Sequence, residues 1–96
     1  MTSAAEMTET FVGGSIAGGA SKAGTGIVEG IYTATIVTTA DWIIFGDFAE
    51  VKSVYGTVDS SGAYQVCVID GTTKNKVTIT TTGASTFVVK GTPATV

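Results

Sequence analysis

The sequence predicts an all-β fold, a small antiparallel β-sandwich or open barrel of about five to six strands with an extended N-terminal arm. The chain has no leucine but 18 threonines, 12 valines and eight isoleucines, and β-branched residues favour strands over helices. Apolar and polar residues alternate over several stretches after residue 26. Short turns rich in glycine, aspartate and serine separate those stretches.

Residues 1–26 form a separate compositional block, dominated by glycine, alanine, serine and threonine. The glycines make a helix costly there. Two interpretations stay open, a disordered tail and an arm that becomes ordered on a neighbouring molecule. Phe11, Val12 and Ile16 would anchor such an arm. The chain is therefore divided into an N-terminal arm, 1–26, and an antiparallel β domain, 27–96.

The β domain is predicted to begin with a strand at 27–39. Both faces of this strand carry apolar residues, so it is central or interfacial. An aromatic run follows at 42–48, and further strands are predicted at 50–58, 63–69, 76–82 and 85–90. Turns at 59–62, 70–71 and 83–84 join the last four strands as a meander. Alternation in 63–69 places two sets of side chains on opposite faces: Tyr64, Val66 and Val68 on one, Gln65, Cys67 and Ile69 on the other.

Reactive residues are scarce. With one cysteine and no histidine, the chain is not expected to form an internal disulfide or a zinc site. Cys67 has no histidine base and is interpreted as a small buried hydrophobe. Asp41, Asp47 and Glu50 offer carboxylates for a metal or for catalysis, but they fit no known loop and are read as charges that solvate strand ends. We therefore predict no catalytic, cofactor-binding or metal-ligating residues, no cofactor and no enzyme.

Charge and length point to protein partners. The formal net charge is −3 and the five lysines are scattered, which argues against nucleic acid and against an anionic membrane surface. No stretch approaches the roughly 20 apolar residues of a membrane span, and the first ten residues lack the basic charge of a signal peptide. A 96-residue chain has a marginal core, so we expect a homo-oligomer.

Four of the eight aromatic residues lie within 42–55. They are interpreted either as the core of the sandwich or, in part, as subunit contacts, because tryptophan and tyrosine are common at the centres of interfaces. Together with the arm, the run gives the expected assembly contacts: Phe11, Val12, Ile16, Trp42, Phe45 and Phe48.

The order of strands and turns also carries a resemblance. It runs through IYTATIVTTADWIIFGDFAEVKSVYGTV, the turn DSSG, AYQVCVIDGTTKNKVTITTT and, after a Gly-Ala turn, TFVVKGTP. This order resembles small β-rich virion proteins of tailed bacteriophages and archaeal viruses, of the head-decoration type. The resemblance spans about two thirds of the chain and does not extend to residues 1–26. It implies capsid binding or lattice formation, and it transfers no site residues.

The leading hypothesis is therefore a virion structural protein on the capsid surface or tail, which binds copies of itself and a major capsid protein without catalysis. One alternative is a subunit of an extracellular filament or surface layer assembled by strand addition. A second is a small ligand-binding β module that uses Trp42 and Tyr55 or Tyr64 as platforms.

Overall fold

Eight strands, whose side chains alternate between a buried and an exposed face, form the fold. The computed structural model describes residues 4–16 and 27–94, with only the backbone of residues 15, 16, 27 and 28. The strands are β1 (Thr10–Ile16), β2 (Ile27–Ile36), β3 (Trp42–Ile44), β4 (Phe48–Val58), β5 (Tyr64–Gln65), β6 (Cys67–Ile69), β7 (Lys76–Ile79) and β8 (Gly83–Pro93). No helix in the described part of the chain is long and apolar enough to cross a membrane.

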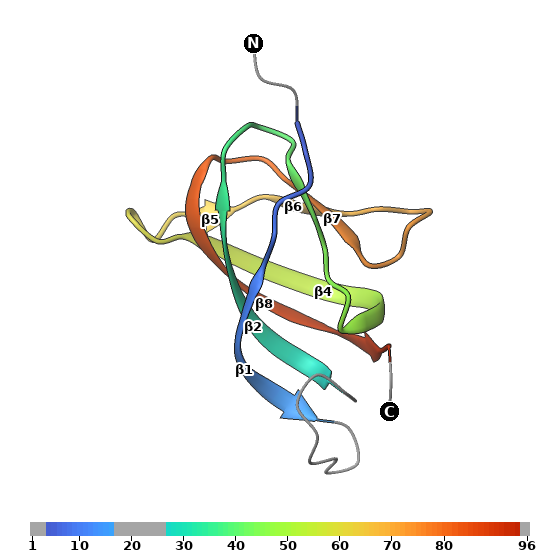
Figure 1. Cartoon of the computed structure of the whole chain (residues 1–96). Helices are drawn as coiled ribbons and strands as arrows, with labels where there is room; N and C mark the ends of the chain where they lie inside the picture. The colour runs from blue at the N-terminus through green and yellow to red at the C-terminus, as the bar shows by residue number, and fades with distance from the viewer. Residues whose placement is uncertain (1–3, 17–26, 95–96) are drawn as a thin grey trace.

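The strands are arranged in two antiparallel sheets (Figure 1). The larger sheet has the order β1-β2-β8-β4-β5, and the smaller has the order β3-β7-β6. The predicted antiparallel all-β class is therefore confirmed. The strands outnumber the five to six expected, partly because the run 63–69 is divided at Val66. There the chain leaves the larger sheet as β5 and enters the smaller one as β6.

The last strand departs from the predicted meander. β8 does not follow β7 in the same sheet but lies between β2 and β4, where Val88 faces Ile31 on one side and Tyr55 on the other. Two predicted hairpins are kept: β4 and β5 pair across the turn at 59–62, with Thr57 opposite Tyr64, and β6 pairs with β7, with Ile69 opposite Val77. Such a placement depends on pairing between residues far apart in the sequence, which alternation within a strand does not report.

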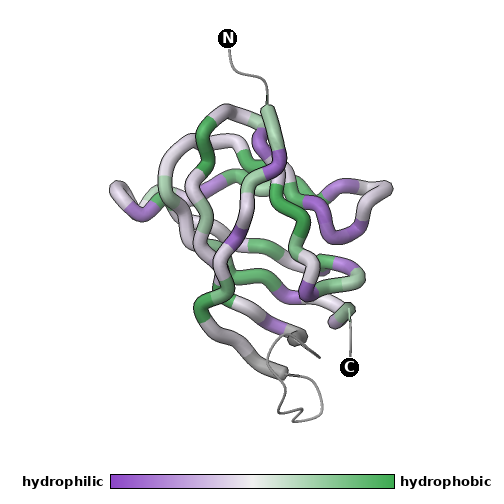
Figure 2. The backbone as a smooth tube through the Cα atoms, viewed as in Figure 1, coloured by the Kyte–Doolittle hydropathy of each residue, from purple (hydrophilic) through white to green (hydrophobic). Residues whose placement is uncertain are grey.

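Hydrophobic residues are spread along the strands of both sheets (Figure 2). The core takes alternate residues of β2, β7 and β8, together with residues of β3, β4 and the loop between those two strands. Its aromatic rings meet edge-on, with Phe45 5.2 Å from Tyr32 and 6.3 Å from Phe87 between ring centroids. Gly56 makes room for Phe87, because a Cβ at position 56 would approach that ring to 2.7 Å. The buried cluster contains Tyr32, Ala34, Ile36, Ile43, Phe45, Phe48, Val51, Val77, Ile79, Phe87 and Val89.

The N-terminal segment is joined to both sheets. The amide of Met7 donates to the carbonyl of Trp42 at 2.7 Å and the amide of Trp42 donates to the carbonyl of Ala5 at 3.1 Å, so residues 5–7 lie along the free edge of β3. Next, β1 pairs with β2, and Gly14 fits there because a Cβ would come within 2.1 Å of the carbonyl oxygen of Glu29.

The predicted division at residue 26 therefore needs correction. Residues 4–16 are part of the β domain, since their backbone hydrogen bonds are made to its own strands. The remainder of the predicted arm, residues 1–3 and 17–26, lies outside the described residues.

Candidate functional site

The outer face of the larger sheet carries apolar side chains that nothing in the described chain covers. Ile31, Val88 and Tyr55 lie opposite one another on β2, β8 and β4. Tyr64 on β5 is paired with Thr57 and packs diagonally against the ring of Tyr55. We call these four residues the outer row. Three of them are exposed, Ile31 to 39%, Tyr55 to 54% and Tyr64 to 56%, while Val88 is half-buried.

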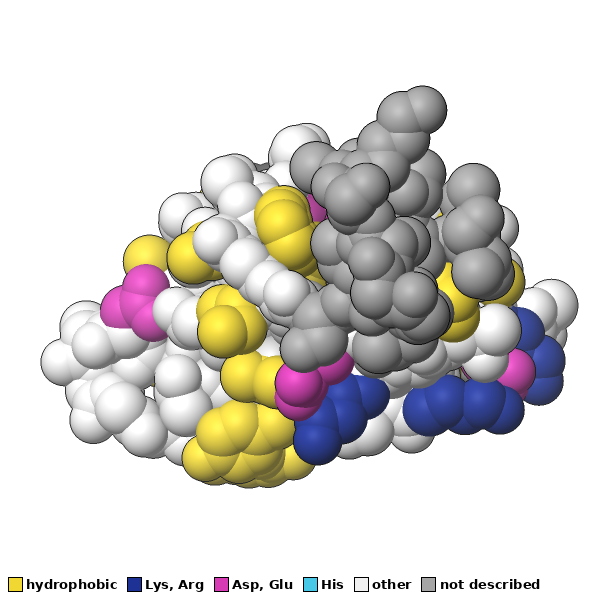
Figure 3. Space-filling view, turned by 90° about the horizontal axis from the view of Figure 1, so that it is seen from below, with side chains coloured by type: hydrophobic (Ala, Val, Ile, Leu, Met, Phe, Trp, Pro, Cys, Tyr) yellow, Lys and Arg dark blue, Asp and Glu magenta, His cyan; other side chains and the backbone are white. Residues whose placement is uncertain are grey.

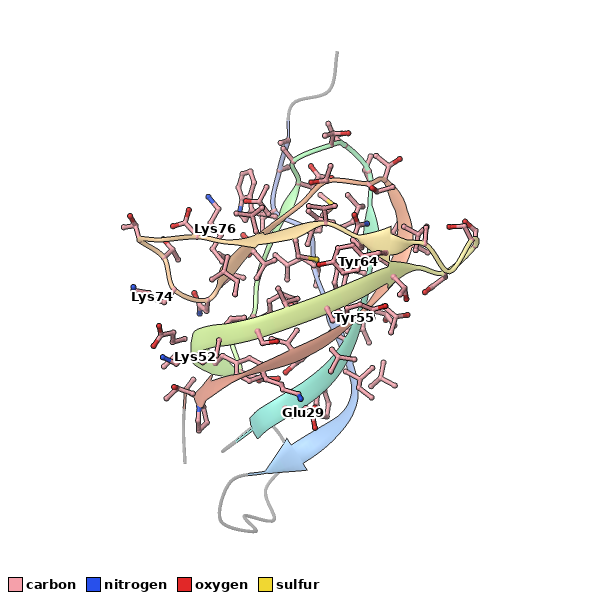
Figure 4. All side chains as sticks on the ribbon, turned by 180° about the vertical axis from the view of Figure 1, so that it is seen from behind. Glu29, Lys52, Tyr55, Tyr64, Lys74 and Lys76 are labelled. Carbon is pink, nitrogen blue, oxygen red and sulfur yellow. The ribbon has the colours of Figure 1, made fainter. Side chains whose placement is uncertain are left out.

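The two tyrosines at the end of the outer row form a pair. Their ring centroids are 5.3 Å apart with the planes tilted by 41°, and both rings project from the same side of the sheet (Figure 4). An exposed aromatic pair of this kind offers large apolar area at little cost in conformational entropy.

Polar rows flank the outer row on both sides. On one side lies a threonine row in register across four strands, composed of Thr10, Thr33, Thr86 and Thr57. On the other side, Lys90 pairs with Glu29 at 3.4 Å. In the space-filling view, hydrophobic side chains gather on the surface beside an acidic and a basic side chain (Figure 3). An apolar centre with a polar rim is the usual composition of a protein interface.

The apolar surface continues along the chain beyond Tyr64. Val66 and Val68 follow at two-residue intervals on the same side and are also exposed. Lys52, Lys74 and Lys76 lie at the other end of this side of the molecule, away from Tyr64 (Figure 4). Exposed apolar side chains therefore occur on the larger sheet from β2 to β5 and also on β6 of the smaller sheet.

The predicted contacts in the aromatic run are mostly buried. Phe45 is fully buried and Phe48 is 1% exposed, so neither ring is available to a neighbouring copy and their expected role as assembly contacts is corrected to one in the core. Trp42 is half-buried, and the ammonium group of Lys76 lies 4.7 Å from its ring centroid. One face of the tryptophan is thus occupied within the chain.

The predicted anchors of the arm have three different environments. Phe11 packs edge-on against Tyr32 with 5.4 Å between ring centroids, yet it stays 42% exposed. Val12 is 61% exposed and stands at a bulge, where it has no partner residue on β2. The side chain of Ile16 lies outside the described residues. Contact of these side chains with a neighbouring molecule stays a prediction.

The three carboxylates around the aromatic run act within the chain. Asp41 is buried and accepts hydrogen bonds from the amides of Ala5, Val37 and Thr38 at 2.8 to 3.0 Å. These donors, that of Thr38 first, lower the pKa of Asp41. Asp41 therefore caps a turn and holds the N-terminal segment, which corrects its interpretation as a solvated charge.

The other two carboxylates also have partners. Asp47 accepts a hydrogen bond from the hydroxyl of Tyr32 at 2.8 Å, and burial followed by this bond raises the pKa of Tyr32. Glu50 pairs with Lys52 at 3.0 Å on the surface. Burial also raises the pKa of Glu9, which faces Asp47 and Glu6. Within the ranges 4–16 and 27–94, no group of three or more potential ligands is arranged to hold a metal ion.

Cys67 is half-buried against the core, and its thiol lies 3.4 Å from the carbonyl oxygen of Gln65. Burial raises the pKa of the thiol to about 11, so it is protonated at neutral pH and is a poor nucleophile. This geometry gives Cys67 no chemistry of its own.

An open hollow of about 520 Å³ lies beside the threonine row. Its lining is mostly hydroxyl and small side chains, namely Thr8, Thr10, Thr33, Ala34, Thr35, Asp59, Ala84 and Ser85. Asp59 is engaged there by the hydroxyl of Thr86, which donates to it at 2.7 Å. The hollow therefore offers hydrogen-bonding groups from four threonines, Ser85 and Asp59.

Reasoning from the sequence missed Ile31 and Val88 as surface candidates, and it named Tyr64 only as a platform in the ligand-binding alternative. The alternation of β2 and of 63–69 did place Ile31 and Tyr64 on defined faces, but it did not show which face would be covered. The available signal was the presence of apolar residues on both faces of one strand. Comparisons with protein-family models, curated proteins and solved structures give no match for the chain.

Proposed function

We propose that the protein is a structural subunit that works by binding protein surfaces, copies of itself first, and that it performs no catalysis. The observation that carries this proposal is the outer row, an uncharged apolar line with an exposed tyrosine pair on an uncovered sheet face. Monomeric proteins rarely leave such a continuous surface exposed unless it binds something.

The proposed mechanism is burial of the outer row against a second protein. The tyrosine rings supply most of the apolar area, and the Glu29–Lys90 pair and the threonine row form a polar rim that tolerates partial hydration. The low charge density, 14% of residues, keeps electrostatic repulsion between equal copies small.

In biological terms we propose a virion structural protein of the capsid-decoration or lattice-forming type, located on the capsid surface or tail. The partners are then other copies of the chain and a major capsid protein. The support is the resemblance in the order of strands and turns together with an uncovered sheet face suited to a protein shell. A filament or surface-layer subunit uses the same physics but forms open-ended polymers, which electron microscopy of the purified protein distinguishes.

The test is the solution mass of the double variant Tyr55→Ser/Tyr64→Ser beside that of the wild type. Both side chains are more than half exposed, so the fold is expected to persist while self-association is lost. Val37→Ser is the matched control, because Val37 is 64% exposed but lies outside the outer row. Equal association of the wild type and the double variant would contradict the proposal.

A second candidate is a small module that binds a polyol or carbohydrate. The observation that favours it is the hydroxyl-lined hollow beside the threonine row. Titration of the monomer with oligosaccharides, followed by the NMR signals of Thr33, Thr86 and Tyr55, tests it. Saturable shifts confined to these residues support this function, and an unchanged spectrum removes it.

A further inference from the structure

The larger sheet ends in a strand whose outer edge lacks the features that normally block the addition of another strand. β1 is seven residues long and reads TFVGGSI, with no charged residue and no proline. In the described part of the chain β1 pairs only with β2, so the hydrogen-bonding groups of its second edge have no strand partner there. Natural proteins usually guard such an edge with lysine, proline or a very short strand.

The other described edges are short or occupied, unlike that of β1. β5 has two residues and β6 has three, which leaves little backbone for a ladder. The free edge of β3 is taken by residues 5–7 through the two hydrogen bonds of Trp42. β1 is therefore the long free edge among the described strands.

Side chains on β1 also leave room for a close approach. Positions 13 and 14 are glycines, and Val12, exposed to 61%, stands at the bulge without a partner on β2. Gly13 faces Ile31, so the line of the outer row reaches β1 at this residue. A strand added beside β1 would extend that row directly.

We propose that β1 pairs with β1 of a second copy, antiparallel about a two-fold axis, to join the two larger sheets into one. The partner is a second copy for two reasons. An antiparallel pair of identical strands is self-complementary, and Thr10–Ile16 carries no charge, so no like charges face each other within the paired segment. The joined sheet would align the outer rows of both copies.

This inference deepens the proposed function and rests on it, because it names one contact within the assembly. A ladder over seven residues buries less area than a stable interface needs. The β1 contact is therefore expected to be weak alone and to strengthen when the outer rows are also covered.

The first test is the association constant of Val12→Lys, measured by sedimentation, beside the matched control Val37→Lys. Both positions are exposed to a similar extent, 61% and 64%, so both variants are expected to fold, which circular dichroism checks. Val12→Lys should associate more than about tenfold more weakly than the control, because each copy then carries a charged side chain at the edge that pairs. Equal constants for the two variants would overturn the inference.

The second test is cross-linking of Val12→Cys with a short thiol-specific bifunctional reagent. Cross-linked dimers are expected for Val12→Cys and not for Val37→Cys, and Cys67 is present in both, so its reaction cancels in the comparison. If Tyr55→Ser/Tyr64→Ser dissociates the assembly while Val12→Lys does not, the edge pairing is wrong and the proposed function stands. If the wild type never associates, both are wrong.

Discussion

The two faces of the larger sheet are built from alternate residues of the same strands, yet the inner face is buried and the outer face is exposed. On the inner face, Tyr32, Phe87 and Val89 are completely covered. On the outer face, their direct neighbours Ile31 and Val88 are apolar as well, but no second layer of the described residues covers them. The comparison shows that the apolar content of the outer face exceeds what the fold itself requires.

The sheet also has the opposite case, in which a polar side chain is buried next to an exposed apolar one. Gln65 is fully buried beside the exposed Tyr64, because its amide has partners inside: it donates to the carbonyl of Thr81 and accepts from the amide of Thr81. Burial of the amide costs little once it is satisfied. The position of a residue in this sheet therefore follows the available partners and not hydropathy alone.

The largest expected effect is on the inner face. Phe87→Ala removes a ring that packs on Phe45 and on Gly56, so the free energy of unfolding should fall by about 3–5 kcal/mol, measured by urea denaturation. A loss as small as that of a surface substitution would show that the inner face is not the core.

An intermediate effect is expected at Asp41, the buried carboxylate that joins the N-terminal segment to the turn before β3. Its pKa is lower in the folded chain than the ordinary value of about 3.9. Its contribution to stability is therefore complete above that value and is lost as the pH falls through the folded pKa. Asp41→Asn should be less stable than the wild type at neutral pH, and thermal unfolding should show the difference shrinking in acid. A difference that stays constant with pH would contradict this role.

The smallest expected effect is on the outer face. Tyr55→Ser alone should change the free energy of unfolding of the monomer by no more than about 0.5 kcal/mol, as for other exposed positions. Urea denaturation at low protein concentration measures it without a contribution from association. A loss comparable to that of Phe87→Ala would mean that the outer row belongs to the core and is not available for binding.

Much of the fold could be predicted from the sequence, because strand alternation and turn chemistry are local. The separation of Tyr64, Val66 and Val68 from Gln65, Cys67 and Ile69 agrees with the burial of the two sets. The turn at 59–62 is also observed, with Gly62 at a positive φ of 71°. Local patterns thus give the elements and their two faces.

The candidate site could be predicted only in part, because it depends on long-range pairing. Nothing local places β8 between β2 and β4, and without that placement Val88 does not meet Ile31 and Tyr55. For Phe45 and Phe48 the sequence left a position in the core and an assembly contact both open, because the aromatic run offers bulk on both faces. The chain reverses between them, where the amide of Phe48 donates to the carbonyl of Phe45 at 3.0 Å, and both rings enter the core.

The most direct test of the central claim is the solution mass of the unmodified chain over a wide range of concentration, measured by analytical ultracentrifugation. The account predicts reversible association that grows with concentration and is lost in Tyr55→Ser/Tyr64→Ser. A strictly monomeric wild type at every concentration would contradict it.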